Sequence, residues 1–237
     1  MFAAGKRPTA NDIERLLSSP DLAGAAAHIS YRPPNDEGWL EILATGLTFD
    51  LLGLAPQQPA STPPIENFYG VTANALPEHT EAVTLVPGEH INSLRATLPV
   101  VRAMTSLAAS IALPLGAQAL CWHPASSVME PQYFSRIVFN WLAGGAFPAL
   151  GLTAVLEQAD GSIASRGLTY FIGQELQLEA RKGEAKADSV KLAVRLIDHL
   201  VRSGRLQAAR ELQGPGGERL VAEPSSSGDT VWVWRGG

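Results

Sequence analysis

The chain has 237 residues, of which 46% are hydrophobic and 17% charged, a composition typical of a globular protein rather than a disordered one. Its formal net charge of −5 argues against binding to nucleic acid or to an anionic membrane surface, because both need a positive field. The single cysteine excludes an intrachain disulfide. The N-terminus lacks the apolar region of a signal peptide and no apolar run is long enough to span a membrane, so we expect a cytoplasmic protein.

The first 56 residues predict a small N-terminal α/β subdomain. Its expected elements are a helix over 10–19, capped by Thr9 or Asn11, and strands over 25–31, 39–44 and 47–52. The segment 57–76 is rich in proline and serine near its start, which predicts a linker. We therefore expect the main domain to cover residues 77–237.

Longer elements follow in the main domain. The apolar spacing predicts helices over 97–112, 130–142 and 186–203, and strands over 82–86, 117–123, 150–157, 162–171, 174–180, 219–222 and 230–234. Asp160-Gly161 is a strong signal for a hairpin between two of these strands. Frequent hairpins among alternating strands and helices favour an α+β fold, with a mixed, mostly antiparallel sheet backed by helices in an elaborated ferredoxin-like arrangement.

The catalytic candidates are His123, Glu130 and Glu175. His123 ends a strand and Glu130 opens a helix, and such positions often meet at the end of a sheet. Glu175 follows Gly173 on a strand whose second face is acidic. Two simpler interpretations stay open, namely that Glu130 stabilises the start of its helix and that Glu175 is one exposed strand carboxylate.

A Cys121–His123 dyad is poorly placed for nucleophilic catalysis. The two side chains share one face of a strand and emerge roughly 7 Å apart, whereas a dyad needs direct hydrogen-bond contact. The five histidines show no paired metal-ligand spacing, so we expect no metal site, and no sequence feature indicates a cofactor. The chain also lacks the nucleophile-elbow, P-loop, zincin and dinucleotide-binding motifs.

The candidate binding residues lie at the ends and outer faces of apolar elements: Trp122, Gly173, Gln174, Trp232 and Trp234. The last two share one face of the final strand, where they could stack on a ligand or a partner. The alternative is that this aromatic pair packs on the core or at a subunit interface.

Three stretches share a pattern with a known family: ALCWHPASSVMEPQYF, LGLTAVLEQADG and GLTYFIGQELQLE, with the matching positions Trp122, Pro124, Gly167, Leu168, Gly173, Glu175 and Leu176. On these positions, residues 80–205 resemble an uncharacterised bacterial family of α+β domains of unknown function. In this chain Gly173 and Glu175 are separated by one residue, a tighter spacing than in the family. The resemblance implies an α+β fold and transfers no catalytic residue.

Two hypotheses about function follow. The first is a non-catalytic module that binds another protein or a second copy of itself, supported by the lack of catalytic motifs and by the apolar residues Trp232, Trp234, Phe68 and Tyr69. The alternative is an enzyme that hydrolyses a small polar substrate with His123, Glu130 and Glu175 at the sheet end. That alternative requires the three side chains to converge.

Overall fold

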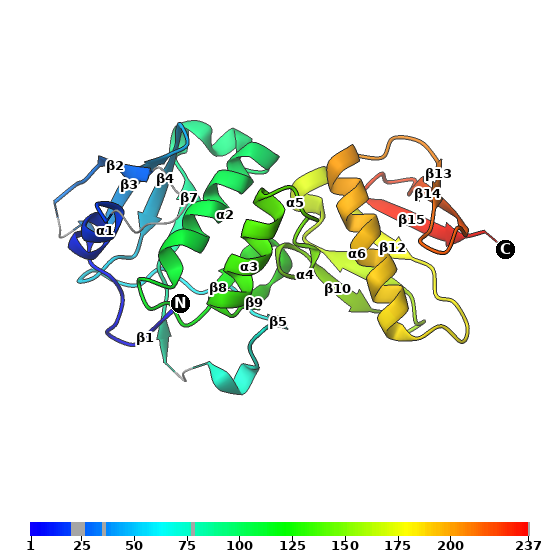
Figure 1. The fold of residues 1–237 in the computed structure, drawn as a ribbon, viewed down its shortest axis with the longest axis horizontal. Coiled ribbons are helices and arrows are strands. Elements are labelled where there is room, and N and C mark those ends of the chain that lie inside the picture. The colour runs from blue at the N-terminus through cyan, green and yellow to red at the C-terminus, as the bar shows by residue number, and fades with distance from the viewer. Residues whose placement is uncertain (20–26, 35–36, 77–78, 237) are drawn as a thin grey trace. The chain divides into compact units, whose positions relative to one another are not determined.

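The computed structural model describes residues 1–19, 27–34, 37–76 and 79–236 (Figure 1). Its contacts divide the chain into two compact units: unit 1 consists of Met1–Cys121 and Val128–Gly145, and unit 2 of Trp122–Ser127 and Ala146–Gly237. These boundaries differ from the linker predicted at 57–76. The physical reason is strand pairing across that segment, because β4 (Leu47–Leu52) pairs with β7 (Thr84–Pro87) in one sheet.

Unit 1 is built on a four-stranded antiparallel sheet in the order β2-β3-β4-β7, with β2 at Ala27–Tyr31 and β3 at Trp39–Ala44. The strands over 39–44 and 47–52 have the predicted bounds. Residues of the expected 25–31 strand before Ala27 lie outside the described residues. Buried Leu40 and Ile42 alternate with half-buried neighbours along β3, which is the two-residue period of a strand with one face in the core.

The other strands within residues 1–145 are short. β1 (Phe2–Ala3) pairs with β6 (Thr80–Glu81), and a further small sheet has the order β5-β9-β8, with β5 at Asn67–Tyr69, β8 at Leu120–Trp122 and β9 at Ser127–Met129. Two 3-10 turns lie at Ala73–Ala75 and Glu89–Leu94.

Three helices complete unit 1: α1 (Ala10–Leu17), α2 (Leu98–Ala112) and α3 (Pro131–Leu142). All three lie close to their predicted ranges. Helix α2 packs against β4, β7 and α3, and buries Val101 and Leu107. Proline occurs in the first turn of both α2 and α3, where its missing N–H leaves no helical hydrogen bond unmade.

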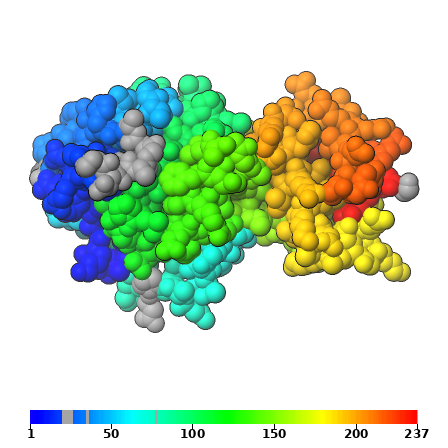
Figure 2. Space-filling view, viewed as in Figure 1, coloured from blue at the N-terminus to red at the C-terminus, as the bar shows by residue number. Residues whose placement is uncertain are grey.

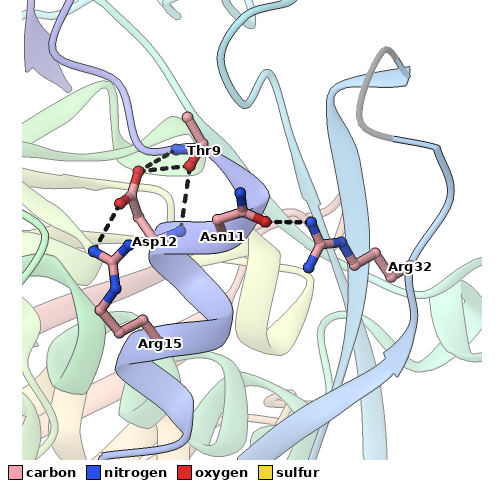
Figure 3. A network of polar contacts seen from close by, with 5 residues as sticks. All are labelled: Thr9, Asn11, Asp12, Arg15 and Arg32. Carbon is pink, nitrogen blue, oxygen red and sulfur yellow. Dashed lines mark hydrogen bonds and ion pairs between the residues drawn. The ribbon is translucent and has the colours of Figure 1, made fainter.

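Helix α1 begins with a reciprocal cap (Figure 3). The Thr9 hydroxyl accepts the Asp12 N–H, while the Asp12 carboxylate accepts the Thr9 N–H at 2.9 Å. Arg15 pairs with Asp12 at 3.3 Å, and Arg32, beyond β2, donates to Asn11 at 2.5 Å. The cap therefore fixes where α1 starts, and Arg32 ties the helix to the end of β2.

We predict that Thr9→Ala lowers the free energy of unfolding by about 1 kcal/mol, because it leaves an N–H of the first turn without its acceptor. Thr9→Ser keeps the hydroxyl and should retain most of the stability. Urea denaturation of both variants checks this, and equal losses in the two would contradict the role of the hydroxyl.

Unit 2 is built on a six-stranded sheet in the order β10-β11-β12-β15-β14-β13. Its strands are β10 (Ala154–Glu157), β11 (Ile163–Arg166), β12 (Glu175–Leu178), β13 (Arg210–Gln213), β14 (Arg219–Pro224) and β15 (Thr230–Arg235). Each half is an antiparallel meander of three strands, and β12 and β15 join the halves in the one parallel pairing among these strands. The sequence did not predict β13.

Helix α6 (Lys186–Ser203) covers one face of this sheet, contacts β10, β11 and β12, and leaves its own outer side at the surface (Figures 1 and 2). The α+β class with a mostly antiparallel sheet backed by helices is confirmed. The connectivity of unit 2 departs from a ferredoxin-like βαββαβ order, because a single long helix separates two complete meanders.

Two strands predicted in unit 2 are shorter than expected because they lead into or out of helical turns. α4 (Ala149–Leu152) precedes β10, and α5 (Thr169–Ile172) follows β11. Gly151 and Gly167 both have positive φ, a conformation that an extended strand does not contain. Between the two strands, Asp160-Gly161 forms the predicted turn, with Gly161 at φ +82°.

The end of β15 is fixed by a largely buried ion pair. The Arg235 guanidinium donates to both carboxylate oxygens of Glu184, at 2.6 and 2.5 Å, and Glu184 also accepts the Ser189 hydroxyl of α6. These hydrogen bonds, led by that of Arg235, hold the pKa of the Glu184 carboxyl below its ordinary value. A bidentate pair of this kind anchors the last strand to the start of α6.

We predict that Glu184→Gln lowers stability at pH 7 by about 1–2 kcal/mol, since it removes a charge-assisted pair. A carboxyl whose pKa is lowered by folding stabilises the folded protein at pH values above the pKa it has in the unfolded chain. That stabilisation is lost as the pH falls through the lower pKa of the folded protein. The gap between wild type and variant should therefore narrow as the pH falls below about 4. Urea denaturation between pH 7 and pH 3 measures the difference in free energy of unfolding between wild type and variant. A difference independent of pH would contradict the stabilising role of the ionised Glu184–Arg235 pair.

Candidate functional site

The turn at residues 123–125 meets the turn after β11, both in unit 2. Gly167 has φ +87°, and a Cβ added there would lie 2.9 Å from the Pro124 carbonyl oxygen and 3.0 Å from the Ala125 Cα. Only glycine fits such a close approach of two backbones. The two turns are thus packed together at Gly167, with no room between them for a ligand.

An aromatic cluster lies beside this contact. The Trp122 ring stands edge-on to Tyr170 at 5.3 Å between centroids and is stacked near Phe171 at 6.1 Å, and Phe147 meets Phe171 at 4.9 Å. Trp122 is 9% exposed. It was a candidate binding residue, but its ring serves the packing of unit 2.

The Glu175 carboxylate is occupied by donors from its own neighbourhood. It accepts hydrogen bonds from the backbone N–H groups of Gly167, Leu168 and Thr169, at 2.8, 3.2 and 3.1 Å, and from the Ser165 hydroxyl. The carboxylate thereby caps the turn into α5. The interpretation of Glu175 as an exposed strand carboxylate is replaced by this capping role.

Gly173 and Gln174 also serve the framework. Gly173 ends α5 with φ +72°, and a Cβ there would lie 2.7 Å from Nη1 of Arg205, which donates to the Gly173 carbonyl. The Gln174 side chain is fully buried; its amide donates to the carbonyls of Leu206 and Gly228, and its oxygen accepts the Leu206 N–H at 2.7 Å.

His123 and Cys121 do not form a dyad. Strand β8 ends at Trp122, and His123 opens a 3-10 turn with its side chain exposed and without a hydrogen bond to any described residue. Cys121 contacts the Met1 sulfur at 3.1 Å, and burial raises the pKa of its thiol. A thiol shifted in that direction is a poor nucleophile at neutral pH.

Glu130 is the N-cap of α3. Its carboxylate accepts the Tyr133 N–H at 2.8 Å, as the simpler interpretation of its position predicts. It belongs to unit 1, whereas His123 and Glu175 belong to unit 2. The structure thus gives each of the two carboxylates a local capping role and shows no hydrogen bond that joins the three catalytic candidates. Across the described ranges, no group of three His, Cys, Asp or Glu side chains could hold a metal ion.

Trp232 and Trp234 lie on the opposite side of the unit 2 sheet from α6. They alternate along β15 with Val231 and Val233, which are buried in the core, while the tryptophans are 38% and 41% exposed. Their rings stack on each other at 5.6 Å with an interplanar angle of 10°. The two tryptophans therefore do not pack in the core of unit 2. They form an aromatic pair on its surface.

Polar residues that the sequence did not single out flank this pair. Gln177 of β12 and Glu223 of β14 are the register partners of Trp232 on either side. Glu179, the residue after the end of β12, continues the pairing with β15 and lies two residues after Gln177, on the same face. Val221 is the partner of Trp234. We call the surface made by Trp232, Trp234, Gln177, Glu179, Val221 and Glu223 the tryptophan face.

Two hollows in unit 2 are lined by other residues. One, of about 350 Å³, lies between the end of α6 and β13 and is lined in part by His199, Leu206 and Leu212. The other, of about 470 Å³, lies at the start of α6, where Lys186 pairs with Glu157 at 2.7 Å. Neither contains a residue that the sequence analysis proposed as a site.

Comparisons with protein-family models, curated proteins and solved structures gave no match. No helix among the described residues is long and apolar enough to cross a membrane.

We predict that Gly167→Ala lowers the free energy of unfolding of unit 2 by about 2–4 kcal/mol. The loss should exceed the cost of the positive φ alone, because the Cβ of the alanine would clash with the backbone of Pro124 and Ala125. Gly183→Ala is the matched control: its φ of +81° is similar, but nothing lies within 4 Å of the added Cβ. Urea denaturation measures both. Equal losses would contradict the close packing of the two turns.

Removal of the Glu175 carboxylate should be similarly costly. We predict that Glu175→Ala lowers stability by about 2–4 kcal/mol, because three backbone N–H groups lose their acceptor. Glu223→Ala removes an exposed carboxylate from the same sheet face and should change stability by less than about 0.5 kcal/mol. A small effect of Glu175→Ala in the same denaturation assay would be inconsistent with its capping role.

Proposed function

We propose that the chain is a non-catalytic binding module, and that the tryptophan face of unit 2 is its contact surface for another protein. The observation that carries the proposal is the exposure of Trp232 and Trp234 on the middle of a sheet whose opposite side forms the core. Tryptophan is enriched at the energetic centres of protein interfaces, where its large ring buries much area with few rotatable bonds.

The chemistry of the other candidates supports a binding role over a catalytic one. The Glu130 and Glu175 carboxylates accept local hydrogen bonds that cap helical turns, and the exposed His123 ring has no partner among the described residues to orient it. General acid–base catalysis needs a side chain that is both positioned and available to a substrate. No specific observation favours the hydrolase alternative.

The Trp232→Ala/Trp234→Ala double variant tests this proposal. We expect it to lose a protein that the wild-type chain captures from a lysate of its source while it stays folded, with a stability loss of about 1–3 kcal/mol because the two stacked rings are partly covered. Affinity capture with mass spectrometry and urea denaturation provide the two readouts.

Tyr31→Ala is the matched control for this test, because Tyr31 is an aromatic residue of unit 1 that is 55% exposed. It should leave capture unchanged. Capture that survives the double tryptophan substitution, or that Tyr31→Ala abolishes as well, would overturn the assignment of the surface.

A further inference from the structure

We propose that the tryptophan face binds an extended segment of another protein that carries two arginine side chains. This inference rests on the function proposed above and names the chemistry of the partner. Its evidence is the combination of uncompensated carboxylates and exposed indole rings on one sheet face.

The two carboxylates beside the tryptophans carry charge that no cation of the described residues neutralises. Glu223 is exposed, and its carboxylate has no hydrogen bond or ion pair to a described residue. Glu179 accepts the Arg235 backbone N–H with one oxygen, at 2.9 Å, and its other oxygen has no described partner. Farther along the same face, Glu211 is already paired with Arg219, so the uncompensated charge beside the rings is negative.

The rings favour a planar cation. Indole is the side chain that binds cations most strongly through its π face, and arginine can stack on it while its N–H fork reaches a carboxylate. Trp232 and Trp234 stack on each other at 5.6 Å and thus present their outer faces and edges. They do not form the separated walls of a cage for a quaternary ammonium group.

The sheet geometry sets the distance between the two cations. Glu179 directly follows β12 and Glu223 lies on β14, on opposite sides of β15. Two interstrand spacings and the two-residue offset along the strands place their Cα atoms roughly 12 Å apart. Two residues four positions apart in an extended chain project to the same side and are separated by about 13 Å. The expected ligand therefore has arginines at positions i and i+4.

A second copy of the chain fits this face less well. A two-fold contact through the tryptophans would bring the Glu179 and Glu223 carboxylates of two copies together, in a chain whose formal net charge is −5. Like charges that face each other at an interface are costly, whereas an arginine-bearing segment neutralises them. Nucleic acid is opposed by the same negative charge.

The test uses a nine-residue peptide of glycine and serine with two arginines four positions apart. It is titrated into the ¹⁵N-labelled full chain, and the indole N–H signals of the five tryptophans are followed by NMR. We expect the Trp232 and Trp234 signals to shift, and the shifts to weaken as salt is added. A peptide with citrulline in place of arginine keeps the shape without the charge and should not bind.

Charge variants locate the contact. Glu179→Gln/Glu223→Gln should raise the peptide's Kd by about fivefold, and the single reversal Glu223→Arg, at an exposed position, by at least as much. Asp188→Asn is the matched control, because it removes one charge from the exposed side of α6. It should change the Kd by less than about twofold.

Three results would overturn the proposal: no shift of the Trp232 and Trp234 signals, equal binding of the citrulline peptide, or equal effects of Asp188→Asn and Glu223→Arg. A chain that sediments as a dimer and becomes monomeric on Trp232→Ala/Trp234→Ala would instead assign the face to a second copy. If the peptide fails to bind but the double tryptophan variant still loses a captured protein, only the arginine chemistry is wrong. If capture is also unaffected, the proposed function fails with it.

Discussion

The parallel pairing of β12 with β15 is the interaction on which the rest of unit 2 depends. It joins two meanders that would otherwise be separate three-stranded sheets, and it places Leu176 beside Val231 and Leu178 beside Val233 in one buried layer. The four side chains are at most 1% exposed. Burial of each aliphatic side chain stabilises the fold by about 1.5–3 kcal/mol, so the four together contribute several kcal/mol to the stability of unit 2.

The same pairing determines what the opposite face presents. Because side chains alternate along a strand, burial of Val231 and Val233 obliges Trp232 and Trp234 to point outward, between β12 and β14. The carboxylates of Glu179 and Glu223 then lie on either side of the two rings. An aromatic pair flanked by acids is thus a consequence of the register rather than of any local motif.

The glycine-containing turns of unit 2 have a different role. Gly167, Gly173 and Glu175 are required by backbone geometry: one glycine permits the approach of two turns, the other ends α5, and the carboxylate caps the turn between them. Their spacing therefore describes how this part of the chain folds. Residues of this kind resemble a site in sequence, since they interrupt apolar runs with glycine and charge.

Local patterns allowed much of the secondary structure to be predicted. The α6 range, the β3 and β4 ranges and the Asp160-Gly161 turn follow from apolar periodicity and turn chemistry, which depend on neighbours in sequence. Strand β13 was missed because Arg210–Gln213 is a polar edge strand with little apolar alternation.

Long-range pairing limited the prediction of units and of the site. The pairing of β4 with β7 spans the segment 57–76, so a composition rich in proline did not mark a boundary. Likewise, the sequence placed Trp232 and Trp234 on one face of the final strand but left open whether that face packs on the core. The neighbours of the two rings were not predicted. Gln177 and Glu179 are brought there by the parallel pairing of β12 with β15, strands more than 40 residues apart in sequence, and Glu223 by the register of β14 with β15.

The central claim is that unit 2 meets its ligand at the tryptophan face and not at the glycine-containing turns. Amide hydrogen exchange of the full chain, with and without saturating arginine peptide, tests it most directly. We expect exchange to slow in residues 175–179, 219–224 and 230–235 and to stay unchanged in 122–125 and 167–173. Slower exchange confined to 122–125 and 167–173 would contradict the account and return attention to His123.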